Sequence, residues 1–216
     1  MKVDILVPTT LSDITLEQYQ KFVKLNSDEN KNTSFLLHKM VEIFCDLDLK
    51  NVAKIKFSNV KNIIKNLDKI FLEKPPLKNT FILNNKKFGF IPILDEITLG
   101  EYVDLDQTLS DWQKMHKAMS VLYRPVIFEH KDKYQIETYD GDKYAEEMKK
   151  APLDVVFGCI VFFYNLSNEL LEITLNYLNK DLKEMSMEQK QILEESGIGI
   201  NQFMDLLKGT LQDSTK

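Results

Sequence analysis

The chain has 216 residues, 44% of them hydrophobic, and a formal net charge of −5 at pH 7. This length is sufficient for one substantial core or for two small packed units. Its 28 basic and 33 acidic residues are interspersed, Arg124 is the only arginine, and the lysine-dense stretch 50–78 has the spacing of a helix with a solvated face, so the sequence argues against a nucleic-acid surface. The apolar run at the start of the chain is too short for a secretory signal. The chain has only two cysteines, which is too few for a disulfide framework and indicates a reducing compartment. We therefore expect a cytoplasmic protein.

A short pattern occurs twice in the first half of the chain, at 11–19 and at 94–102. Both copies place Leu, Ile, Thr, Leu and Tyr at the same spacing, and an apolar stretch ending in proline precedes each copy. Each copy therefore predicts a strand, a turn and a helix. The pattern is compatible with a duplicated unit, at about 1–56 and 79–125, and equally with two helices that use a common start signal.

Each copy contains the residues of a capping box at its helix start. Thr15 and Thr98 can accept a hydrogen bond from the amide three residues later, where Gln18 and Glu101 can reach back to the amide of the cap. We therefore predict that these four residues are structural caps.

Periodicity along the chain predicts a mostly helical α+β fold. Apolar residues recur at helical spacing in a segment that starts at Leu99 and in the segments 16–25, 35–47, 58–73 and 111–122. Two pairs of short β-prone runs predict a small hairpin at 80–91 and a second hairpin or extended ribbon at 126–136.

The longest apolar stretch, 153–166, predicts a helix that continues to about residue 178. Pro152 fits the first turn of this helix, where no backbone amide is needed. Asp154 and Asn165 interrupt the stretch, which is shorter than the ~18 residues of a membrane span. We expect a long central apolar helix around which both units pack, within a single compact body, 1–179, that crosses no membrane.

Residues 180–216 are expected to form a C-terminal helical segment with a frayed tail. Its apolar and methionine side chains suit either the core or an adaptable contact surface. Two aromatic residues beside the predicted helix at 111–122 are further interface candidates. The predicted partner-binding residues are Trp112, Tyr123, Met185, Met187, Phe203, Met204 and Leu207.

The sequence contains no recognisable catalytic or cofactor-binding constellation. None of its seven glycines forms a phosphate-binding loop, and no two of its histidines, among them His38 and His116 in equivalent places of the two copies, lie at the three- or four-residue spacing of helical metal sites. Cys45 and Cys159 lie in apolar runs, which is typical of buried free thiols. We therefore predict no enzyme, no cofactor and no bound metal.

One phrase of the sequence resembles proteins of tailed bacteriophages. It runs from Phe88 to Asp104 and continues in the segments 112–119 and 122–125. The phrase is similar to a family of small uncharacterised phage proteins, over the chain from its start to about Asn179. A sheet edge followed by a Thr-x-x-Glu-Tyr helix start also loosely resembles tail and baseplate assembly chaperones.

The resemblance implies a virus-encoded structural or assembly role without enzymatic activity, as a neck or tail piece or as a tail assembly chaperone. The implied partners are other phage structural proteins, with further copies of the chain as a second option. The implied location is the host cytoplasm, with incorporation into the virion left open. The alternative is a small cytoplasmic regulatory protein or enzyme that acts on host machinery.

Overall fold

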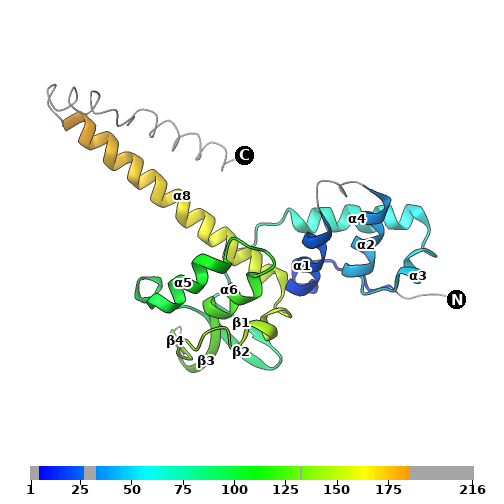
Figure 1. Cartoon of the computed structure of the whole chain (residues 1–216), viewed down its shortest axis with the longest axis horizontal. Coiled ribbons are helices and arrows are strands. Elements are labelled where there is room, and N and C mark those ends of the chain that lie inside the picture. Colours follow the sequence, from blue (N-terminus) through cyan, green and yellow to red (C-terminus); the bar gives the residue numbers. More distant parts are fainter. Residues whose placement is uncertain (1–4, 27–32, 132, 185–216) are drawn as a thin grey trace. The chain divides into compact units, whose positions relative to one another are not determined.

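The computed structural model describes residues 5–26, 33–131 and 133–184 of the chain (Figure 1). Over these ranges the helices are α1 (Leu16–Leu25), α2 (Ser34–Phe44), α3 (Leu49–Val52), α4 (Phe57–Phe71), α5 (Leu99–Thr108), α6 (Met115–Leu122), α7 (Ala145–Met148) and α8 (Leu153–Glu184), with the 3-10 turns η1 (Leu11–Asp13) and η2 (Leu94–Glu96). The strands are β1 (Thr80–Leu83), β2 (Lys86–Phe90), β3 (Tyr123–His130) and β4 (Lys133–Ile136). The predicted mostly helical α+β class is confirmed.

The two copies of the repeated pattern form the same local structure. Each begins with a 3-10 turn and continues, after its threonine, into a ten-residue helix, α1 or α5. Gln18 Oε1 accepts a hydrogen bond from the Thr15 amide at 2.9 Å, and Glu101 Oε2 accepts one from the Thr98 amide at 2.6 Å. Each threonine hydroxyl accepts the reciprocal bond, so all four residues occupy capping positions.

Within the described residues, only the second copy follows a strand. β2 ends at Phe90, just ahead of η2, whereas the segment 5–8 ahead of η1 pairs with no strand of the described chain. The predicted opening strand therefore does not form within the described residues, because no other strand lies beside it to complete the hydrogen-bond ladder.

The two predicted hairpins belong to one antiparallel sheet, in the order β1-β2-β3-β4. Asn84 and Asn85, with φ of 49° and 62°, form the two-residue turn between β1 and β2, as left-handed backbone there favours Asn or Gly. The hairpins are joined because β2 pairs with β3, with Gly89 opposite Arg124. The sequence did not reveal this pairing, since α5 and α6 separate the two strands along the chain.

The chain separates into two units, Met1–Cys159 and Ile160–Lys216, and α8 begins in the first and continues into the second. Leu153, Val155 and Val156 are fully buried, whereas every described side chain of α8 from Ile160 onward is half-buried or exposed. The expected central, buried position therefore applies only to residues 153–159. The apolar sequence of the helix indicated burial, but apolar side chains are also found on surfaces that bind partners.

Candidate functional site

Tyr123, one of the predicted interface residues, lies in the core. Its side chain is fully buried, and its ring contacts Phe81 and Phe90 with centroids 5.2 and 5.3 Å apart. Its hydroxyl donates a hydrogen bond to the Lys78 carbonyl at 2.8 Å, and burial raises the pKa of this hydroxyl. The interface prediction for Tyr123 is wrong, because α6 ends one residue earlier and β3 directs the side chain into the core.

Trp112, the second candidate, is half-buried among aromatic rings. Its ring lies 4.7 Å from the Tyr19 ring, and both rings contact Phe157 of α8. The Trp112 carbonyl accepts a hydrogen bond from Gln20 Nε2 at 2.7 Å. These contacts connect the segment before α6 to α1 and to the start of α8, within the first unit. The remaining candidates, Met185, Met187, Phe203, Met204 and Leu207, lie outside the described residues.

The histidines in the two copies have different environments. His38 is exposed on α2, whereas His116 is buried on α6 with its Nδ1 3.1 Å from Gln20 Nε2. Burial, followed by the charge of Lys149, lowers the pKa of His116, so the buried ring is neutral near pH 7 and packs against α1. The described residues contain no group of three or more His, Cys, Asp or Glu side chains that could hold a metal.

Both cysteines are free and buried. Burial raises the pKa of Cys45 to about 11 and that of Cys159 to about 12. Each thiol therefore stays protonated near neutral pH and is a poor nucleophile.

A polar cluster around Arg124 was not predicted from the sequence. Arg124 Nη1 lies 2.6 Å from Glu101 Oε1, with side chains only 9% and 5% exposed. The guanidinium also lies over the Tyr139 ring, whose hydroxyl donates a hydrogen bond to Asp104. The signal in the sequence was the chain's single arginine, but nothing local indicated that its partner would be the capping residue of α5.

A cavity of about 430 Å³ opens beside this cluster, with isoleucine side chains on its walls. Arg124 is neutralised by Glu101, and burial with the Asp104 contact raises the pKa of Tyr139 to about 12. Arg124 and Tyr139 therefore each have a partner within the chain, Glu101 and Asp104.

Apolar side chains are exposed along α8 beyond Ile160. Tyr164, Leu170 and Ile173 are 40%, 55% and 56% exposed. Leu166, Leu170 and Ile173 are four and three residues apart, the spacing that places side chains on one face of a helix. Such a face is typical of helices that pack against another protein.

The part of α8 from Leu153 to Thr174 is also long and apolar enough to cross a membrane, and only 17% of its most apolar window is buried. However, the residues 153–159 already belong to the core of the first unit. The remaining residues, 160–174, span about 22 Å as a helix, short of the ~30 Å hydrocarbon layer. They also include Glu169 and Glu172, which are costly in a bilayer.

Comparison with protein-family models, with curated proteins and with solved structures finds no match to this chain.

Proposed function

We propose that this chain is a non-enzymatic protein of a tailed bacteriophage that binds other virion components during assembly, as a neck or tail piece or as a tail assembly chaperone. The exposed apolar face of α8, with Leu166, Leu170 and Ile173, is the binding surface. The proposed setting is the host cytoplasm, where the virion components assemble.

The exposure of this face is the observation that carries the proposal. Each apolar Å² removed from water contributes about 25 cal/mol, so covering side chains that are half exposed favours association. The polar side chains Asn165, Glu169 and Glu172 follow another side of α8, which leaves one face for a partner and one for water.

The reactive groups of the first unit support a binding role over catalysis. The buried thiols are protonated, His116 is neutral and bonded to Gln20, and Arg124 is paired with Glu101. Each of these groups has a structural partner or environment that accounts for its position.

The test is an affinity pull-down of the full chain from infected cells, with identification of the retained proteins by mass spectrometry. We expect portal, tail or capsid proteins to be retained by the wild-type chain. A double variant, Leu170→Lys with Ile173→Lys, should lose them, because two charges on the apolar face would have to be desolvated in the complex.

Asn165→Lys is the matched control, since it adds a lysine to an exposed position on another face of the same helix. It should retain the same proteins as the wild type. Recovery of host enzymes in place of virion proteins would reject the phage assembly role, and equal retention by both variants would reject α8 as the binding surface.

A further inference from the structure

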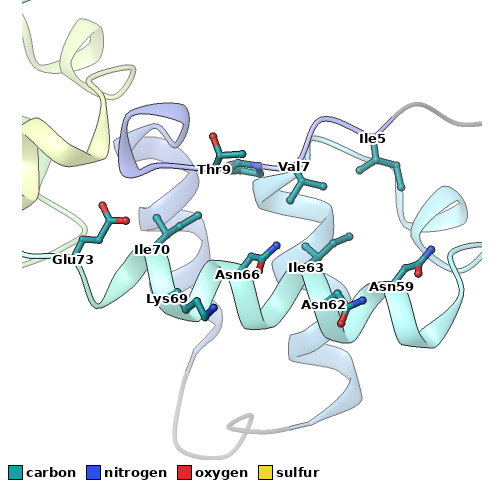
Figure 2. A pocket seen from close by; sticks show the side chains of 11 residues that line it. Ile5, Val7, Thr9, Asn59, Asn62, Ile63, Asn66, Lys69, Ile70 and Glu73 are labelled. Atoms are coloured by element: carbon teal, nitrogen blue, oxygen red, sulfur yellow. The ribbon is translucent and has the colours of Figure 1, made fainter.

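A groove separates the start of the described chain from α4 (Figure 2). It encloses about 650 Å³. Ile5 and Val7 point toward α4, from which Ile63 and Ile70 point back, while Leu6 between them is 88% exposed. This alternation of inward and outward side chains is the one that a β-strand shows.

The backbone of this segment has no partner within the described chain. No amide or carbonyl group of residues 5–8 bonds to a described residue, whereas the amide of Thr9 donates to Asp13 Oδ2 at 2.9 Å. Unpaired amide and carbonyl groups in a row form the edge to which another strand can add. The segment therefore provides one side of a strand-binding site.

α4 provides the other side, through a row of amide side chains. Asn59, Asn62 and Asn66 line the groove, and none of their side chains has a hydrogen bond to a described residue. Asn62 and Asn66 are about 6 Å apart along the helix axis, close to the ~6.6 Å between alternate residues of a strand. An Asn side chain donates and accepts hydrogen bonds, so it can bond to polar groups that a strand presents at this interval.

We propose that this groove binds an extended segment of a partner polypeptide, which adds as a strand to residues 5–7 and lies over the Asn59, Asn62 and Asn66 side chains. Lys69 and Glu73 carry opposite charges at one end of the groove, so the site favours a segment without strong net charge. The proposal is independent of α8, because it concerns a different surface of the chain.

A second copy of the same segment fits the groove poorly. In that arrangement the Ile5 and Val7 side chains of the added strand would face the three amides and leave them without hydrogen bonds, which is unfavourable once water is excluded. Pro8 would also end the ladder after a few bonds, because it has no amide hydrogen. A partner strand with polar side chains toward α4 can form hydrogen bonds both with the backbone of residues 5–7 and with the asparagine side chains of α4.

The test begins with a displayed library of random twelve-residue linear peptides, selected for binding to the full chain. Hydrogen-exchange mass spectrometry then follows the chain with and without the tightest peptide, and titrations give its Kd. We expect slower exchange in the peptide fragment that contains Leu6 and Val7. We also expect Asn62→Leu with Asn66→Leu to weaken binding at least tenfold, because leucine keeps the shape of asparagine without its hydrogen bonds.

Asp68→Leu is the control, since Asp68 is exposed on a different face of α4. It should leave Kd unchanged. The proposal is overturned if no selected peptide binds, if exchange near Leu6 does not change, or if the double variant binds as well as the wild type. If exchange near Leu6 slows as the protein concentration rises in the absence of peptide, the occupant is a second copy of the chain. This result would also overturn the proposal.

The variant with Leu170→Lys and Ile173→Lys separates this site from the α8 surface. It should bind the selected peptide with the wild-type Kd. Loss of peptide binding in this variant would place the peptide on α8 and reject the groove.

Discussion

At the scale of single residues, the capping position of each copy also connects its helix to the rest of the first unit. Gln18 caps α1 with its oxygen and donates from Nε2 to the Ile43 carbonyl of α2 at 2.9 Å. Glu101 caps α5 with one oxygen and pairs with Arg124 of β3 through the other. The local role follows from the spacing of Thr and Gln or Glu, whereas the distant contact depends on what the fold brings beside the helix.

Glu101 should make the stability of the chain depend on pH. Burial alone would raise the pKa of this carboxyl, but the Thr98 hydrogen bonds and the Arg124 charge outweigh burial and hold it below its usual value. A carboxylate whose pKa is lowered by folding stabilises the folded state above its unfolded pKa of about 4.3, and this contribution disappears as pH falls through the lower, folded value. Glu101→Gln keeps a capping side chain but removes the charge.

Urea unfolding between pH 3 and pH 7 measures this effect. The free energy of unfolding of Glu101→Gln should be lower than that of the wild type at pH 6 to 7, and the difference should shrink as the pH falls below about 4.3. Glu96→Gln, at an exposed position nearby, should show no such difference. A constant difference at all pH values would mean that the charge of Glu101 does not stabilise the fold.

At the scale of elements, α8 combines a buried start with an exposed continuation. Gly158, in the buried part, lies against the backbone of the loop that follows α4, since a Cβ atom at this position would come within 2.4 Å of the Pro76 carbonyl oxygen. Helix α8 can approach this loop only because residue 158 has no side chain. The sequence predicted both the helix and the break at Pro75 and Pro76, but not that the two segments touch.

Gly158→Ala should therefore destabilise the chain, although alanine is the better helix former. The clash is with backbone, which cannot rotate away as a side chain could, so we expect a net loss of about 1–2 kcal/mol in the free energy of unfolding. Asn165→Ala, at an exposed position of the same helix, should be neutral or slightly stabilising. Thermal and urea unfolding measure both, and an increase in stability for Gly158→Ala would contradict the close approach.

At the scale of the whole molecule, the chain consists of two units joined by a continuous helix, with the division after Cys159. The first unit includes the sheet, helices α1 to α7 and the first turns of α8. Ser12 Oγ donates a hydrogen bond to Asp154 at 2.6 Å, and Lys78 also pairs with Asp154. The start of α8 is therefore held in this unit by polar contacts in addition to apolar packing.

Truncation tests the position of this division. A chain that ends at Asn165 keeps the buried turns and should unfold cooperatively at the same urea concentration as the first unit of the full chain. A chain that ends at Pro152 loses Leu153, Val155 and Val156, whose burial contributes about 5–9 kcal/mol together. Because domains are stable by only ~5–15 kcal/mol, this chain should be largely unfolded by circular dichroism. Unfolding of the longer chain would show that residues beyond 165 belong to the first unit.

The sequence by itself determined the local structure of this protein. The helix starts at Thr15 and Thr98, the turn at Asn84 and the end of α4 before Pro75 follow from interactions among residues that are close in the chain. These interactions need no distant partner, so a pattern of residue types is sufficient to predict them.

Only the tertiary structure decided which faces are covered. Leu16 and Leu99 hold the same place in the two copies, yet Leu16 is fully buried and Leu99 is 78% exposed, because the Leu16 amide donates to the Ala151 carbonyl beside the start of α8. The joining of the hairpins, the pairing of Arg124 with Glu101 and the exposure of α8 likewise depend on segments distant in sequence. Residue type indicates that a side chain is apolar, but the fold decides whether protein or water surrounds it.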